Sequence, residues 1–129
     1  MAVKEPKKVL IVDDEAFIRL LLEQTLEDLE EEGVEIISAE NGDEALALVK
    51  SEHPRLVFLD VMIPHMSGFE VCRVIKHELK YEDVYVVILT AKGQEYDKEI
   101  SRQVGADLYV TKPFDPDELL ALATRVLKV

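Results

Sequence analysis

The stretch Leu56-Val57-Phe58-Leu59-Asp60 is an unbroken run of apolar residues that ends in a single acid. A run of this kind predicts a β-strand whose two faces are both covered, as in parallel sheets. Similar apolar runs occur at residues 9–12 and 84–89. We therefore expect three buried strands in the middle of one sheet.

Two weaker strands complete the predicted sheet. Residues 34–39 mix apolar with polar side chains, and residues 108–110 form only a short run, so both are expected at the edges. Stretches with helical spacing of apolar residues separate the strands. The expected helices lie at about residues 18–29, where Gly33 is placed to end the helix, at 45–49, 69–79 and 94–104, and from Pro116 onward, with Asp115 as its N-cap.

The predicted elements form a strand followed by a helix, repeated five times. Strands joined by helical crossovers are parallel, and the helices cover both faces of the sheet. With the weaker strands at the edges, the strand order is 2-1-3-4-5, the flavodoxin-like order of doubly wound sheets. We therefore expect an α/β, flavodoxin-like (βα)5 three-layer sandwich on a five-stranded parallel sheet, as a single domain over residues 1–129 with its core at about 7–127.

The composition excludes several classes of protein. The 129 residues include 15 Lys and Arg against 27 Asp and Glu, for a net charge of −12. This balance argues against direct nucleic-acid binding, which needs a basic face, and against a polybasic membrane anchor. Cys72 is the only cysteine, which excludes an intramolecular disulfide and a cysteine-based zinc site. No apolar run has the length of a signal peptide or a membrane span, so a cytoplasmic location is expected.

Polar residues follow the predicted strands at the ends where open α/β sheets bind their ligands. Asp13 and Asp14 follow the first strand, Asp60 ends the third, Thr90 ends the fourth, and Lys112 lies just past the fifth. Taken singly, an Asp or Thr before a helix is often only an N-cap, and Lys112 fits an ordinary loop. Their joint occurrence at one edge of one sheet is better explained by a shared site.

The three acids predict a bound cation at this edge. Two carboxylates about 4 Å apart repel each other by about 4 kcal/mol at an effective dielectric of 20. Oxygen ligands with few protein contacts suit Mg²⁺, which keeps several waters, and no histidine lies at a spacing that favours zinc. Such a metal can hold a phosphoryl group while a lysine neutralises another oxygen.

Four segments together resemble the response-regulator receiver domain of the CheY type, a module of two-component signalling. They are LIVDD (residues 10–14), LVFLDVMIP (56–64), ILTA (88–91) and GADLYVTKPF (105–114). The resemblance covers about residues 7–127. Its spacing is specific, because 30 positions separate Asp60 from Thr90 and 22 separate Thr90 from Lys112.

The resemblance implies which residues accept the phosphoryl group and bind the metal. Asp60 is the expected phosphoacceptor, which takes the group from the histidine of a sensor kinase or of a histidine phosphotransfer protein. Asp14 and Asp60 are expected to bind Mg²⁺ directly, together with the backbone carbonyl of Met62. Asp13 is expected to act largely through a metal-bound water.

The resemblance also implies a switch. Lys112 is expected to contact the phosphoryl oxygens, with a cis bond to Pro113. Thr90 would hydrogen-bond the phosphoryl group, and Tyr109 matches the aromatic position that turns inward when Thr90 moves. The face of the fourth helix, fifth strand and fifth helix would then change and control a downstream protein. On this view the chain is a signalling protein and no conventional enzyme, although self-phosphorylation from small donors and slow self-dephosphorylation are expected.

Four alternatives stand against this prediction. A flavodoxin-type electron carrier needs a Ser/Thr/Gly-rich phosphate loop where this chain has Asp13-Asp14-Glu15. An aspartate-nucleophile phosphatase is expected to carry a D-x-D pattern at the end of its first strand, whereas Asp13 and Asp14 are adjacent in this chain. A receiver that binds partners without phosphorylation, and a receiver excised from a longer DNA-binding or enzymatic regulator, remain as alternatives.

Two positions depart from the transcription-factor branch of receivers, whose active form dimerises through the helix 4, strand 5, helix 5 face. Leu108 and Leu122 stand where that branch usually has an Asp and an Arg. We therefore expect a monomer or a weak phosphorylation-dependent dimer. The two leucines are either scattered apolar surface residues or a docking patch for a different partner.

Overall fold

A five-stranded parallel sheet forms the centre of the molecule, in the order β2-β1-β3-β4-β5. The computed structural model of the chain describes residues 6–91 and 95–129, without the side chains of residues 95–97. The strands are β1 (Lys7–Val12), β2 (Val34–Ala39), β3 (Leu56–Asp60), β4 (Tyr85–Ala91) and β5 (Leu108–Lys112). The helices are α1 (Ala16–Leu26), α2 (Gly42–Glu52), α3 (Gly68–Arg73), α4 (Glu95–Gln103) and α5 (Pro116–Leu127), with a 3₁₀-helix η1 (Glu27–Glu32) and a π-helix η2 (Val74–Glu78).

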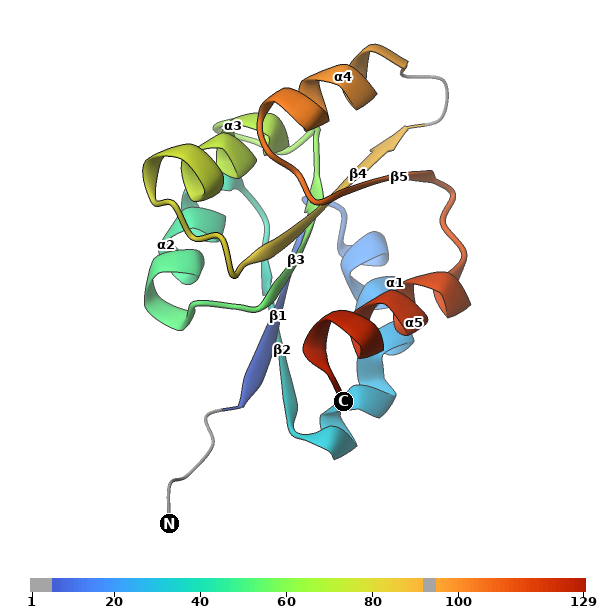
Figure 1. Cartoon of the computed structure of the whole chain (residues 1–129). Helices are drawn as coiled ribbons and strands as arrows, with labels where there is room; N and C mark the ends of the chain where they lie inside the picture. The colour runs from blue at the N-terminus through green and yellow to red at the C-terminus, as the bar shows by residue number, and fades with distance from the viewer. Residues whose placement is uncertain (1–5, 92–94) are drawn as a thin grey trace.

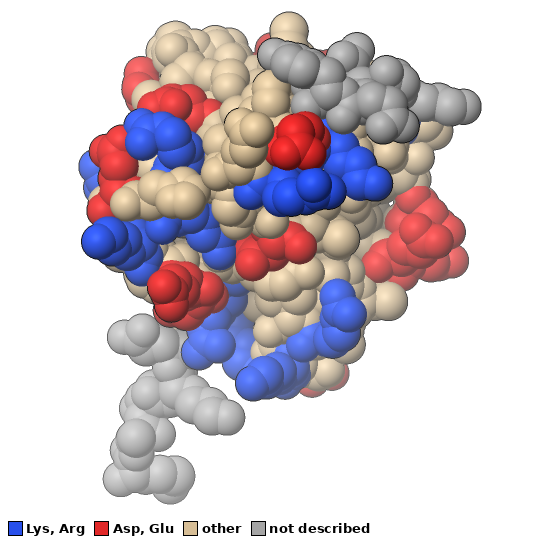
Figure 2. All heavy atoms as spheres, turned by 45° about the horizontal axis from the view of Figure 1, so that its top comes forward, with Lys and Arg blue, Asp and Glu red and all other residues tan. Residues whose placement is uncertain are grey.

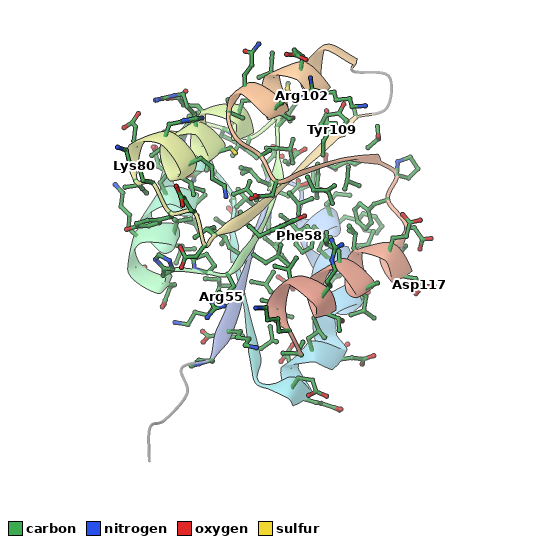
Figure 3. The ribbon with its side chains drawn as sticks, in the orientation of Figure 1. Arg55, Phe58, Lys80, Arg102, Tyr109 and Asp117 are labelled. Atoms are coloured by element: carbon green, nitrogen blue, oxygen red, sulfur yellow. The ribbon has the colours of Figure 1, made fainter. Side chains whose placement is uncertain are left out.

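Helices cover both faces of this sheet, as Figure 1 shows. α1 and α5 lie on one face, and α2, α3 and α4 lie on the other. Phe58 of β3 is wholly buried in the core on the side of α1 and α5 (Figure 3), whereas the next residue, Leu59, belongs to the core on the opposite face. Because both faces are covered, β3 is apolar throughout. The predicted flavodoxin-like fold and strand order are confirmed.

The helix ends follow local signals in the sequence. α1 continues through η1 and ends at Gly33, whose φ of 86° lies in the left-handed region that favours glycine. The Asn41 side chain caps α2 by accepting a hydrogen bond from the Glu44 N–H at 2.8 Å. The Asp115 side chain caps α5 in the same way, from the Asp117 N–H at 2.9 Å. These side chains satisfy backbone donors that have no partner within the helix.

The third helix differs from the regular helix expected over residues 69–79. It is α-helical only to Arg73 and then widens into the π-helix η2, whose end is marked by the Leu79 N–H donating to the Val74 carbonyl at 2.8 Å. Lys76 in η2 donates to the Val84 carbonyl at 2.6 Å and pairs with Asp107 at 2.7 Å. Such a wider turn is rare and has no signature in the helical spacing of apolar residues.

Other boundaries shift by a few residues. β1 begins at Lys7 instead of residue 9, and β5 continues to Lys112 instead of residue 110, because each extension pairs with the neighbouring strand. The predicted start of the fourth helix, Gln94, lies outside the described residues, and α4 is described from Glu95. None of these shifts changes the order of the elements.

Gly68 allows the loop after β3 to fold back on the end of that strand. The Gly68 N–H donates to the Val61 carbonyl at 2.9 Å. A methyl group at Gly68 would lie 2.2 Å from the backbone oxygen of Asp60, which cannot move aside as a flexible side chain can. The missing side chain therefore sets how closely α3 approaches the strand end that carries Asp60.

We expect Gly68→Ala to lower the free energy of unfolding by about 2 kcal/mol, the usual cost of forcing extra atoms into a packed site. Urea denaturation at pH 7 measures the change. The helix preference of alanine over glycine would by itself raise stability. An unchanged or more stable variant would therefore contradict the close approach.

Candidate functional site

The ends of β1, β3 and β5 bring three of the predicted site residues into direct contact. β1 and β3 pair with Val12 opposite Leu59, so Asp13 and Asp60 follow at the same edge, where they are 0% and 6% exposed. Lys112, at the end of β5, places its Nζ 3.2 Å from Asp13 Oδ2 and 3.2 Å from Asp60 Oδ1. These three residues together with Asp14 are named the acidic pocket below.

Lys112 is held as a cation by its two acidic neighbours. Burial lowers the pKa of the Lys112 ammonium group, but the charges of Asp60 and Asp13 and the hydrogen bonds to them outweigh burial and raise the pKa above its ordinary value. One positive charge thus serves two buried carboxylates. The pocket keeps an excess of negative charge, which attracts a further cation.

The position of Asp60 destabilises the charged form of its carboxyl group. Burial is the largest cause that raises its pKa, and the nearby charges of Asp13 and Asp14 add to the effect, while Lys112 opposes them. The result is a pKa of about 6 instead of the ordinary 3.8. Carboxyl groups with a shifted pKa in such clusters are typical of functional sites, because these sites need groups whose pKa is matched to their chemistry.

Asp14 and Glu15 extend the pocket at its exposed rim. Carboxylate oxygens of Asp13, Asp14 and Glu15 lie within 4.8 Å of one another, and no other group of His, Cys, Asp or Glu with this spacing occurs among the described side chains. The Glu15 N–H also donates to Asp13 Oδ1 at 2.9 Å. Oxygen donors of this kind fit Mg²⁺. Glu15 is missing from the residues predicted as ligands, and its only signal in the sequence is its place after two acids.

Thr90 lies on β4, the strand next to Asp60, and Tyr109 lies one strand further away, on β5. Thr90 is buried near the end of β4, opposite Thr111 of β5, which places it at the same edge as Lys112. Tyr109 of β5 lies opposite Ile88 of β4, and its side chain is partly buried against the core on the side of α3. Figure 3 shows Tyr109 at the edge of the sheet, where β5 passes below α4.

The two remaining predicted residues flank the pocket. The peptide bond between Lys112 and Pro113 is cis, the form expected from the resemblance. Met62 follows Asp60 by two residues, and its side chain is exposed rather than packed. The loop that carries Met62 is anchored at its start, where the Val61 N–H donates to the Leu89 carbonyl of β4 at 3.3 Å.

A comparison with known families shows to which family the chain belongs. The family model described as the response regulator receiver domain matches residues 9–124, which is nearly the whole chain. The chain belongs to the response regulator receiver family. Members of this family are signalling modules rather than conventional enzymes. The family recognised from the four sequence segments is therefore confirmed.

This receiver domain resembles parts of larger regulators. It is 44% identical over 124 residues to the probable transcriptional regulator ycf27 of Porphyra purpurea, covering 96% of this chain and 49% of that protein. It is 44% identical over 122 residues to the phosphate regulon transcriptional regulatory protein PhoB of Pseudomonas aeruginosa, covering 95% of this chain and 52% of that protein. The chain thus spans about half the length of these curated relatives, and the single domain over residues 1–129 stays a prediction.

The fold of the receiver domain is also that of a solved chemotaxis protein. The chemotaxis response regulator CheY4 of Vibrio cholerae matches with a TM-score of 0.80 and 33% sequence identity, covering 94% of this chain and 98% of that one.

On the face that Figure 2 shows, Lys and Arg side chains are interspersed with Asp and Glu. No helix among the described residues is long and apolar enough to cross a membrane.

The two leucines that depart from the transcription-factor branch differ in exposure. Leu108 on β5 is 37% exposed, but Leu122 on α5 is only 8% exposed. Leu122 is therefore no surface residue, because it packs on the inner side of α5 in the same core as Leu119 and Ala123. Both leucines line one groove of about 750 Å³ between β5 and α5. The suggestion that they are scattered surface residues is wrong for Leu122.

The raised pKa of Asp60 predicts how stability depends on pH. Because the folded pKa of about 6 exceeds the ordinary 3.8, the folded chain holds the proton more tightly, and its stability falls as the pH rises from about 4 to 6. This corresponds to about 3 kcal/mol lost at neutral pH. Without metal, we expect Asp60→Asn to be more stable than the unaltered chain by about 2 kcal/mol at pH 7, since the loss of the charged Lys112 contact offsets part of the gain.

Urea denaturation in EDTA at pH 4, 5, 6 and 7 measures this difference. The stabilisation should shrink toward pH 4, where the Asp60 carboxyl group of the unaltered chain is protonated. Asp28→Asn, which removes an exposed acid of η1, is the matched control and should show little difference at any pH. A stabilisation of Asp60→Asn that is the same at all four pH values would contradict the raised pKa.

Proposed function

We propose that this receiver domain accepts a phosphoryl group on Asp60 from the histidine of a sensor kinase or of a histidine phosphotransfer protein, in a reaction that requires Mg²⁺. The observation that carries the proposal is the buried Asp60 carboxylate, whose Oδ1 lies 3.2 Å from Lys112 Nζ at the end of β3. A carboxylate with a fixed cation on one side and further acids beside it suits the transfer of a highly charged group.

The acidic pocket fits the Mg²⁺ that this proposal needs. Asp14, Asp60 and the backbone carbonyl of Met62 would hold the ion, with Asp13 acting largely through a water. When bound, the ion neutralises phosphoryl oxygens and lowers the charge repulsion in the transition state. Lys112 supplies the second positive charge, because its ammonium group already lies within hydrogen-bond distance of Asp60.

The chain's own residues account for the transfer step. Asp60 is mostly a carboxylate at neutral pH, since its pKa of about 6 lies below 7. One of its oxygens forms the bond to phosphorus while the bond between phosphorus and the donor histidine nitrogen breaks, and the histidine takes up a proton as it leaves. Later attack of water on the acyl phosphate releases inorganic phosphate and restores the carboxylate. The same steps account for self-phosphorylation from small donors and slow self-dephosphorylation.

We propose that the signal then passes from Asp60 through Thr90 and Tyr109 to α4, β5 and α5. A phosphoryl group adds up to about two negative charges and three acceptor oxygens, and the Thr90 hydroxyl is the proposed donor to one of them. Ser101 of α4 supports a shift of this helix, because its hydroxyl is buried without a hydrogen-bond partner among the described residues. An unpaired buried hydroxyl of this kind costs about 1–3 kcal/mol, so a shift of α4 that gave it a partner would be favourable.

The groove between β5 and α5 is the proposed output surface for a downstream protein. Leu108 is its exposed apolar residue, and Leu122 forms part of its floor. The loss of the usual charges at both positions supports a monomer or a weak phosphorylation-dependent dimer. A receiver within a longer transcriptional regulator is the second candidate, which the half-length match to such regulators favours.

We expect Asp60→Asn to abolish phosphorylation by acetyl phosphate in MgCl₂, because the amide cannot act as the nucleophile. Intact-mass spectrometry of the denatured protein and Phos-tag gels measure the phosphorylated fraction. Asp28→Asn is again the matched control and should be phosphorylated like the unaltered chain. Equal labelling of the Asp60→Asn variant would rule out Asp60 as the acceptor, and labelling of neither the variant nor the unaltered chain would favour a phosphorylation-independent interaction module.

We expect Lys112→Ala to separate phosphorylation from the switch. Asp60 should still accept the group, but without the ammonium contact the amide resonances of α4 and β5 in ¹H–¹⁵N spectra should move far less on addition of acetyl phosphate. Lys50→Ala, which removes an exposed lysine of α2, should show the full change. A full spectral change in phosphorylated Lys112→Ala would show that Lys112 has no part in the coupling.

A further inference from the structure

Arg19 connects α1 to the backbone of the acidic pocket. Its Nη1 donates to the backbone carbonyl oxygen of Asp13 at 2.7 Å, and its Nη2 pairs with Glu40 Oε1 at 3.1 Å. The Arg19 side chain is only 15% exposed, so its contact with the Asp13 carbonyl is partly shielded from water, whereas Glu40 is 66% exposed. The guanidinium group thus links α1, the end of β1 and the segment after β2 at a single point.

The carbonyl that Arg19 holds belongs to the peptide group between Asp13 and Asp14. The other polar groups of Asp13 are also engaged: its N–H donates to the Ala39 carbonyl at 3.2 Å, Oδ1 accepts from the Glu15 N–H, and Oδ2 accepts from Lys112. A peptide group is planar, so its rotation would turn the two flanking residues relative to each other. By holding this peptide group, Arg19 therefore restricts the orientation of Asp14 relative to Asp13.

Arginine suits this role better than lysine would. Its planar guanidinium group presents several N–H donors in a rigid fork, so that one side chain reaches the Asp13 carbonyl and Glu40 together. The first turn of α1 supports the same arrangement, because the Arg19 N–H donates to the Glu15 carbonyl at 3.1 Å. Asp13, Glu15 and Arg19 thus form one connected unit at the start of α1.

We propose that Arg19 is a positioning residue for the adjacent acids Asp13 and Asp14, and that it raises the Mg²⁺ affinity of the pocket through the Asp13 carbonyl. The inference rests on the proposed function, since Mg²⁺ is the ion in question. Residues that orient metal ligands from outside typically contribute 10-fold to 100-fold in metal affinity. We take the lower end, about 10-fold, because Arg19 acts on a backbone group rather than on a carboxylate.

Positioning and charge predict opposite changes in affinity. Arg19 carries a permanent positive charge next to an acidic site, so as a charge alone it repels Mg²⁺, and its removal would tighten binding. As a positioning residue, its removal lets the peptide between Asp13 and Asp14 turn and weakens binding. The sign of the change therefore separates the two roles.

The experiment is a calorimetric titration of the metal-free chain with MgCl₂ alone, without any phosphodonor. We expect Arg19→Gln to bind Mg²⁺ about 10-fold more weakly than the unaltered chain. Arg19→Lys keeps the charge but loses the fork, and should also bind more weakly. Arg73→Gln, which removes an arginine paired with Glu70 and Glu78 on the opposite face of the sheet, is the matched control and should bind Mg²⁺ as the unaltered chain does.

Circular dichroism melting curves establish that each variant is folded at the titration temperature. If Arg19→Gln does not fold, Arg19→Lys alone tests the inference. Affinity that is unchanged or tighter in the folded Arg19 variants would overturn the inference while leaving the proposed function in place. If the unaltered chain binds no Mg²⁺, the metal-dependent function itself is overturned, and the positioning role falls with it. Weaker binding in both Arg19 variants, with Arg73→Gln unchanged, supports the inference.

Discussion

Two buried carboxylates that share one ammonium group are the contact on which the site depends. Lys112 lies 99 positions from Asp13 and 52 positions from Asp60 in the chain, yet it contacts both. Loss of Lys112 would leave both buried carboxylates without their shared cation, and breaking a buried ion pair in this way costs about 3–5 kcal/mol. The contact therefore ties the ends of β1, β3 and β5 together, and it leaves an excess of negative charge that only a further cation can offset.

The parallel sheet makes this arrangement possible. Every strand of such a sheet ends at the same edge, so polar residues that follow separate apolar runs are brought together without any special loop. The apolar runs are buried in two cores, one on each face, which hold the strand ends in place. Backbone contacts refine the positions: Gly68 lets α3 approach the Asp60 carbonyl closely, and Arg19 holds the Asp13 carbonyl.

The proposed switch lies toward one side of the sheet. β1 and β3 lie in the middle of the sheet, whereas β5 is an edge strand with one free side. The Ser101 hydroxyl, which is buried without a hydrogen-bond partner among the described residues, and the partly exposed Leu108 lie on this side, on α4 and β5. In the proposed switch, a change in charge at Asp60 would act on this side of the sheet. The chain is similar both to transcriptional regulators and to a chemotaxis protein, so the same fold occurs in regulators of different kinds.

Much of the fold and of the site could be predicted because apolar runs and helical spacing report how each side chain is buried. By itself the sequence determined the strand order, the edge strands and the edge at which Asp13, Asp60 and Lys112 meet, since parallel strands leave few other arrangements. Only the tertiary structure decided the burial of Leu122, the π-helix at Lys76 and the contact of Arg19 with the Asp13 carbonyl. Each of these depends on a partner far away in the chain or on a backbone atom. Contacts of these two kinds cannot be predicted from the periodicity of residue types.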